Sequence, residues 1–167
     1  MEIDVIDSDV SPDDERFMHE ALRVAERAAR EGDVPVGAIV VQDGRIVGIG
    51  RNRREQDADP VAHAEIVALR DACRGTRRWR VDGATLYVTL EPCPMCAAAI
   101  VNARVARLVY GAADPKAGAA RTLYSICDDA RLNHRVSVHA GVLAQPCAAI
   151  LSDFFRQARA RPRPEVR

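Results

Sequence analysis

Apolar residues recur every three or four positions in the first part of the chain, which is the spacing of one face of a helix. The run follows Ser11-Pro12-Asp13-Asp14, where a proline at the first helical position is typical of a helix start. The run continues up to Gly32. Its apolar members are Phe17, Ala21, Val24, Ala25 and Ala28. We therefore expect an amphipathic helix that covers one face of a sheet.

A β-hairpin and a second helix are predicted next. Segments 36–41 and 45–49 are rich in apolar residues and flank Asp43-Gly44, a pair that favours the tight turn between antiparallel strands. A helix is expected over about 61–73, with Pro60 marking its beginning.

The second half of the chain has the pattern of a βαβ unit. Residues 84–90 and 105–110 are predicted strands and residues 94–103 a helix, so the two strands should be parallel with a right-handed crossover. A fifth strand is expected over 136–140 and a closing helix over 145–159, with apolar Ala148, Leu151, Phe154 and Phe155. The predicted fold class is α/β, a three-layer α/β/α sandwich around a mixed five-stranded sheet.

Length and composition fit a single domain. The 167 residues, 48% of them hydrophobic, can form one core and are too few for two ordinary domains. We expect an acidic, partly disordered leader over 1–12, one domain over 13–160 and a flexible basic tail over 161–167. The five cysteines are odd in number, no signal segment opens the chain and no apolar run is long enough to cross a bilayer. A cytoplasmic protein with reduced thiols and no membrane contact is predicted.

Net charge is zero, but the charges are unevenly distributed. Between Met1 and Glu15 there are seven acidic residues and no basic one. Taking these seven from the 24 acidic residues leaves 17 against 24 basic residues, so the rest of the chain carries +7. That charge is compatible with contact to RNA phosphates. A basic stretch over 70–80 that contains Trp79 fits either an RNA-guiding surface or an ordinary solvated helix end.

Two short motifs carry candidate chemistry. Pro60-Val61-Ala62-His63-Ala64-Glu65 is followed by Glu91-Pro92-Cys93-Pro94-Met95-Cys96, and Cys93 lies thirty positions after His63. Cys93 and Cys96 are three apart, so their sulfurs fall on one side of a first helical turn, whose positive end favours thiolate. His63 and Glu65 can converge if they open a helix. One imidazole and two thiolates suit one tetrahedral zinc ion with water in the fourth position, the arrangement of a catalytic site.

Zinc lowers the pKa of bound water from about 15.7 toward roughly 7, which leaves Glu65 free to act as proton carrier. A structural zinc finger is the alternative, but it needs a fourth protein ligand. Cys73, Cys127 and Cys147 stand alone, as small buried hydrophobic residues commonly do. The same donors could bind another soft metal, although zinc is favoured.

Together the two motifs match the signature of zinc nucleobase deaminases, and the chain resembles that family. From about Arg16 to about Arg159 it is similar to bacterial tRNA-specific adenosine deaminases in particular. The matching segments are Val34-Pro35-Val36-Gly37-Ala38, Asn52-Arg53, Ala84 to Cys93, Asn133-His134-Arg135 and Leu151 to Arg156. The resemblance implies a cytidine-deaminase-like sheet of order 2-1-3-4-5, a homodimer and no organic cofactor. It also implies zinc-dependent deamination of adenosine to inosine at the wobble position of a tRNA anticodon stem-loop.

The resemblance also suggests substrate-binding residues. They are Asn52, Leu90, Asp114, Phe155 and Arg156. Asn52 would read the edge of the flipped nucleoside, although an asparagine there could equally form a turn. Asp114 lies in a small-residue loop after a parallel strand, where α/β proteins place ligand contacts, and its alternative role is a turn residue before Pro115. Of Phe154 and Phe155, we expect one in the core and one as a stacking surface.

Three functional hypotheses follow. The first is a tRNA adenosine deaminase. The second is a deaminase of a free nucleobase or nucleoside of the guanine, cytosine or cytidine type, which would release ammonia without RNA. The third is a catalytically silent zinc-binding subunit, against which the presence of Glu65 argues.

Overall fold

Five strands form one mixed sheet within residues 10–160, the part of the chain that the computed structural model describes. They are β1 (Gly37–Gln42), β2 (Arg45–Arg51), β3 (Thr85–Leu90), β4 (Arg107–Ala112) and β5 (Ser137–Ala140). The order is β2-β1-β3-β4-β5, with β1 antiparallel to both neighbours and β3, β4 and β5 parallel. The predicted sheet and its strand order are confirmed. The predicted leader over 1–12 and tail over 161–167 fall mostly or wholly outside the described residues.

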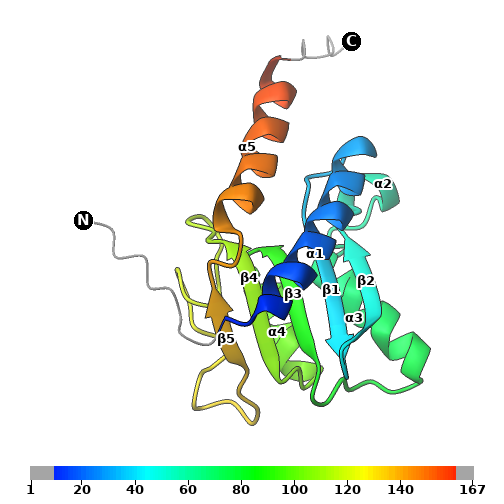
Figure 1. The fold of residues 1–167 in the computed structure, drawn as a ribbon, viewed down its shortest axis with the longest axis vertical. Helices are drawn as coiled ribbons and strands as arrows, with labels where there is room; N and C mark the ends of the chain where they lie inside the picture. The colour runs from blue at the N-terminus through cyan, green and yellow to red at the C-terminus, as the bar shows by residue number, and fades with distance from the viewer. Residues whose placement is uncertain (1–9, 161–167) are drawn as a thin grey trace.

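Helices cover both faces of this sheet. They are α1 (Pro12–Arg30), α2 (Arg54–Asp57), α3 (Ala64–Thr76), α4 (Pro94–Asn102) and α5 (Ala144–Ala160). The helices α1 and α5 lie on one face and α3 and α4 on the other, and the carboxyl-terminal part of α5 extends beyond the sheet (Figure 1). Among residues 10–160, no helix has the length and apolar character needed to span a bilayer.

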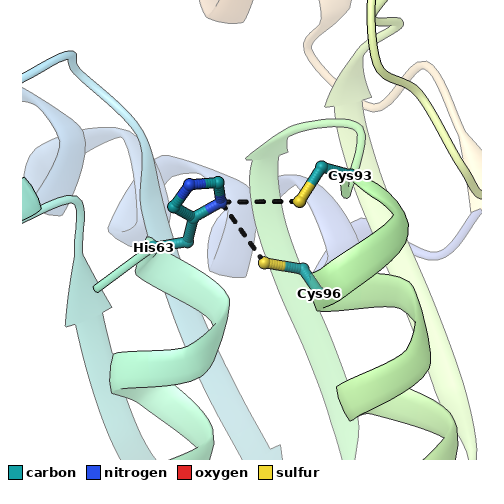
Figure 2. Close-up of side chains that lie close together, drawn as sticks. All are labelled: His63, Cys93 and Cys96. Carbon is teal, nitrogen blue, oxygen red and sulfur yellow. Dashed lines mark hydrogen bonds between the residues drawn. The ribbon is translucent and has the colours of Figure 1, made fainter. Parts of the chain in front are cut away.

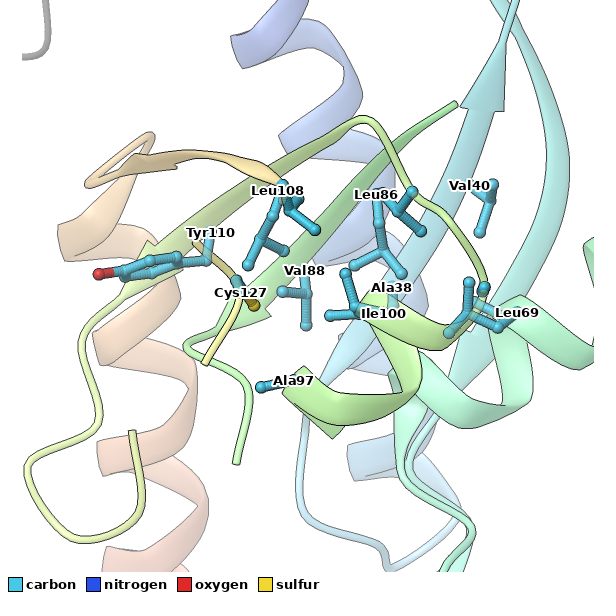
Figure 3. Close-up of a cluster of buried hydrophobic side chains, with 14 of the residues drawn as sticks. Ala38, Val40, Leu69, Leu86, Val88, Ala97, Ile100, Leu108, Tyr110 and Cys127 are labelled. Atoms are coloured by element: carbon cyan, nitrogen blue, oxygen red, sulfur yellow. The ribbon is translucent and has the colours of Figure 1, made fainter. Parts of the chain in front are cut away.

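The alternation of side chains along β1 divides the core into two clusters. Ala38 and Val40 belong to the cluster under α3 and α4, which Figure 3 shows, while Ile39 and Val41 pack in the cluster under α1. Successive side chains of a strand point to opposite faces, so a strand buried on both sides reads as a continuous apolar run. The α/β/α sandwich follows from this double burial.

The β1–β2 hairpin has a tight turn at one end and two glycines in β2 that face α3. Asp43 and Gly44 both have positive φ, 51° and 72°, as the predicted tight turn requires. Two glycines of β2 then allow the close approach of α3. A Cβ built on Gly50 would lie 2.1 Å from the carbonyl oxygen of Ala64, in the first turn of that helix. The start of α3 is thereby fixed over the end of β2.

Several predicted boundaries are wrong. The helix expected over 61–73 begins at Ala64, because Pro60 and Val61 form a turn in which the Asp59 carboxylate accepts the Val61 amide proton at 2.9 Å. The strand expected over 105–110 is Arg107–Ala112, and the short helix α2 was not predicted. In α2, the amides of Glu55 and Gln56 donate to the buried Asp33 carboxylate, at 3.1 and 3.2 Å.

Candidate active site

The two motifs meet at the first turns of α3 and α4. His63 is the N-cap residue of α3 and Cys93 the N-cap residue of α4. Their carbonyl oxygens accept the first helical amide protons, His63 from Val67 at 3.0 Å and Cys93 from Ala97 at 2.8 Å. Residues thirty positions apart in the sequence thus occupy equivalent places at neighbouring helix ends. Helix N-termini carry partial positive charge and favour thiolates.

Three donor atoms converge between these helix ends (Figure 2). The Nδ1 atom of His63 lies 3.5 Å from the sulfur of Cys93 and 3.5 Å from the sulfur of Cys96. The three atoms all lie within 4.8 Å of one another. Zinc bonds of about 2.0–2.1 Å to nitrogen and about 2.3 Å to sulfur, at a tetrahedral angle, separate the two donors by about 3.5 Å. The donor types and their spacing therefore fit zinc.

The thiols differ in acidity. A hydrogen bond from Cys96 lowers the pKa of Cys93 to about 4, and the contact with His63 acts in the same direction. The same cysteine pair, together with burial and the nearby charge of Glu65, raises the pKa of Cys96. One thiolate is thus stabilised by its surroundings, and a divalent cation would favour deprotonation of the second.

Glu65 lies in the first turn of α3, two residues after His63, and is 4% exposed. Burial raises its pKa to about 7, and the charge of Cys93 acts in the same direction, while hydrogen bonds to its own amide and to Cys96 oppose the rise. A buried carboxyl group with a pKa near neutrality can take up and return a proton at physiological pH. The prediction that His63 and Glu65 open one helix is confirmed.

A cavity of about 270 Å³ adjoins these groups. Asn52, Leu90, Asp114 and Phe155, four of the five residues predicted to bind substrate, line it beside His63, Glu65 and Cys93. A second cavity of about 640 Å³ shares Val34, Leu90, Asp114 and Phe155 with the first. Arg156, the fifth predicted residue, lies in this second cavity, together with Lys116 and Arg159. The two cavities therefore adjoin each other, and we refer to them together as the cleft.

The family model for MafB19-like deaminases matches residues 12–159. The tRNA-specific adenosine deaminase of Bacillus subtilis (strain 168) is 47% identical over 146 residues, which cover 87% of this chain and 91% of that protein. The chain belongs to the family of tRNA-specific adenosine deaminases.

Solved structures agree with this membership. One, from a study of A-to-I editing by tRNA:A34 deaminases at the wobble position of transfer RNA, superposes with a TM-score of 0.78 at 44% identity. The match covers 81% of this chain and 99% of that one. A guanine deaminase from Nitrosomonas europaea superposes with a TM-score of 0.73 at 23% identity, covering 87% of this chain and 85% of that one, and shares the fold.

Other residues of this deaminase agree with the sequence-based expectations only in part. All five cysteines, which fall within residues 10–160, are free thiols. Cys127 and Cys147 are buried as expected, whereas Cys73 is only partly buried. His134 contacts the Val105 carbonyl oxygen through Nε2 at 2.6 Å, which is a structural contact. Phe154 is only half-buried and belongs to neither core cluster, so the expectation that one of these two rings lies in the core is wrong. Phe155 is 44% exposed at the cleft, as expected for the other ring.

Sequence reasoning did not identify Arg54 and Glu91, both of which line the cavity that holds His63. Arg54 follows Asn52 at the start of α2, whose existence the sequence did not indicate. Glu91 directly precedes the Pro92-Cys93 motif, and that position was the one signal that could have drawn attention to it.

Proposed function

We propose that this deaminase converts adenosine to inosine at the wobble position of a tRNA anticodon, with release of ammonia. The observation that carries the proposal is the convergence of His63, Cys93 and Cys96 beside the buried Glu65, in a chain 47% identical to a tRNA-specific adenosine deaminase. When bound to His63, Cys93 and Cys96, zinc supplies a Lewis acid that lowers the pKa of water toward about 7.

Glu65 carries the protons in this mechanism. It accepts a proton from the attacking water and passes one to a ring nitrogen of adenine as the new C6–O bond forms. It then takes the proton of the new C6 hydroxyl group and passes it to the departing amine as the C6–N bond breaks, which leaves the C6 carbonyl of hypoxanthine and ammonia. The raised pKa of Glu65, about 7, suits a group that must take up and release protons in the same cycle.

The shape of the cleft favours a polynucleotide over a free base. A target adenine must leave its stack and enter the cavity, where Val36 and Leu90 offer apolar walls and Asn52 an amide for the base edge. Beyond it, Lys116, Arg156 and Arg159 bring cationic side chains to the larger cavity. A free base would need no such extension, whereas neighbouring nucleotides carry phosphates that these side chains attract.

Inosine mapping on total tRNA tests the proposal. Zinc-loaded enzyme should create inosine at the first anticodon position, and Glu65→Ala should create none while still binding zinc. Absence of inosine from every unmodified tRNA would contradict the proposal. Ammonia release from free guanine, cytosine or nucleosides, without RNA, would instead support the alternative deaminase activity. Equal activity of the wild type and Glu65→Ala would indicate a subunit without catalysis of its own.

We also propose that the protein acts as a homodimer in the cytoplasm. Leu123, Tyr124 and Leu132, in the connection between β4 and β5, are 52%, 56% and 42% exposed, and apolar side chains of this size suit an interface. The free thiols are consistent with a reducing compartment. Sedimentation analysis of wild type and Tyr124→Lys tests the dimer, and a wild-type monomer at micromolar concentration would contradict it.

A further inference from the structure

Glu91 is a buried carboxylate that the proton chemistry does not use. It is 2% exposed and lies two residues before Cys93. Its oxygens accept the backbone amide protons of Asp114 at 3.0 Å, Ala120 at 3.3 Å, Arg121 at 2.8 Å and Thr122 at 2.9 Å, and also the Thr122 hydroxyl proton. A carboxyl group that accepts hydrogen bonds from this many donors is favoured in its ionised form.

The donors all belong to one segment. Residues 113–136, which lie within the described part of the chain, form no helix or strand, and the first ten of them bend around the Glu91 carboxylate. The segment is also tied to the zinc motif, because the Ala119 amide donates to the Pro92 carbonyl oxygen at 2.8 Å. A segment without regular structure is ordered here by contacts to the turn that carries Cys93.

The backbone of the segment packs closely against the Glu91 carboxylate. A Cβ built on Gly118 would lie 2.3 Å from one Glu91 oxygen, so the backbone of the segment touches the side chain it surrounds. The Gly118 amide in turn donates to the Asp114 carbonyl oxygen at 2.9 Å. A neutral side chain could not satisfy the same set of donors, because only an ionised carboxylate presents acceptors alone.

The same segment forms one wall of the substrate cleft. Asp114 and Ala117 line the cavity beside Glu65, and Lys116 lines the adjoining cavity. The Asp114 carboxylate caps the turn from within, accepting the Lys116 amide proton at 2.9 Å. Releasing the segment from Glu91 would displace this wall while leaving the three metal donors on the helix ends.

We propose that Glu91 is a positioning residue that holds segment 113–122 as the substrate-facing wall of the cleft, and that it acts on substrate binding through this segment. The proposal rests on the proposed function for its kinetic consequence, but its structural part does not. Removing the charge of Glu91 should loosen the segment and weaken binding of the anticodon stem-loop, with little change at the reacting atoms.

Glu91→Gln tests this most directly, because it keeps the size of the side chain but turns an NH₂ group toward amide donors. Glu20→Gln, the same change at an exposed ion pair on α1, is the matched control. Three quantities are measured on zinc-loaded protein: hydrogen exchange of peptides spanning 113–122, bound zinc per chain, and KM and kcat for an anticodon stem-loop. We expect exchange of this segment to accelerate by about tenfold or more, and KM to rise by about tenfold. Zinc content and kcat should stay within about twofold, and the control should match wild type.

A second variant guards against a folding defect. Thr122→Val removes the one hydroxyl contact and keeps the four amide contacts, so it should raise exchange and KM by about threefold. Unchanged exchange over 113–122 in both variants would overturn the proposal. So would loss of zinc, or a fall of kcat at unchanged KM, which would place Glu91 in the support of the metal. If wild type itself forms no inosine, the proposed function fails, while the exchange measurement still decides whether Glu91 holds the segment.

Discussion

Replacing Asp14 would remove the carboxylate that links α1 to β3 and β4 through hydrogen bonds. Asp14 is fully buried, and its two oxygens accept four hydrogen bonds. Arg107 donates through both terminal nitrogens at 2.6 and 2.8 Å, the Tyr87 hydroxyl at 2.8 Å and the Ser11 amide at 2.8 Å. The predicted helix start at Ser11-Pro12 is therefore also the place where the helix is attached to the sheet.

The size of the effect follows from the pKa of Asp14. Burial raises this pKa, but the hydrogen bonds from Arg107, Ser11 and Tyr87 outweigh burial and lower it from the ordinary 3.8 to about 2. Each pKa step of one corresponds to 1.36 kcal/mol, so ionisation of Asp14 stabilises the folded chain by about 2 kcal/mol at neutral pH. Asp14→Asn should lose about this amount. Asp14→Ala should lose about 3–5 kcal/mol, because it also leaves the partners of a buried ion pair without an acceptor.

Urea unfolding followed by circular dichroism measures both changes. The folded-state pKa is depressed, so the stabilisation is fully present above about pH 4 and is lost as the pH falls toward about 2. The difference between wild type and Asp14→Asn should therefore be constant from pH 7 to about 4 and shrink below that. Asp13→Asn, next to Asp14 but exposed, is the control and should unfold like wild type. A difference below about 0.5 kcal/mol at pH 7, or one that does not change between pH 4 and 2, would refute the reasoning.

Three further predictions concern the site. Gly50→Ala should destabilise the fold by about 1–3 kcal/mol and reduce activity, since its Cβ would meet the Ala64 carbonyl oxygen at the start of α3. Gly75→Ala is the control: Gly75 lies within α3 with open space around it, so this change should be neutral or stabilising. Thermal melts of both variants measure the difference. Chelation of zinc should abolish inosine formation, and stoichiometric zinc should restore it; activity that survives complete removal of the metal would contradict the assigned chemistry. Arg156→Ala should weaken binding of the stem-loop and reduce the slope of log K against log salt concentration by about one. Binding titrations at several salt concentrations measure this slope, and an unchanged slope would place Arg156 outside the RNA contact.

The parts of the fold that the sequence predicted are those determined by local chemistry. Asp43-Gly44 sets the hairpin through the positive φ that its two residues adopt. Apolar runs over β3 and β4 on either side of α4 predicted the parallel unit, because both strands are buried on two faces. The zinc donors were predicted for the same reason, since residue type and spacing alone bring Cys93 and Cys96 to one side of a helical turn.

What the sequence did not indicate depends on contacts between distant residues. The four-residue helix α2 has no room for a periodic pattern, and the carboxylate that receives its first amides, Asp33, lies 22 residues before Glu55. Glu91 was missed for the same reason: its partners are 23 to 31 residues further along, and all but the Thr122 hydroxyl are backbone amides, which no side-chain pattern reveals. The strand order came from family resemblance and not from periodicity, because local patterns do not specify which strands become neighbours.

The metal donors and the proposed substrate-facing wall belong to different kinds of structure. The metal donors and Glu65 lie in the first turns of α3 and α4, which the close contact at Gly50 and the buried core hold in place. The wall that we propose faces the substrate is instead an irregular segment whose amides donate hydrogen bonds to one carboxylate. Changes within 113–122 that keep the amides in place could therefore alter which substrate is bound without disturbing the metal. Changes at Glu91 could not be compensated in this way, because they remove the acceptor that all of these amides share.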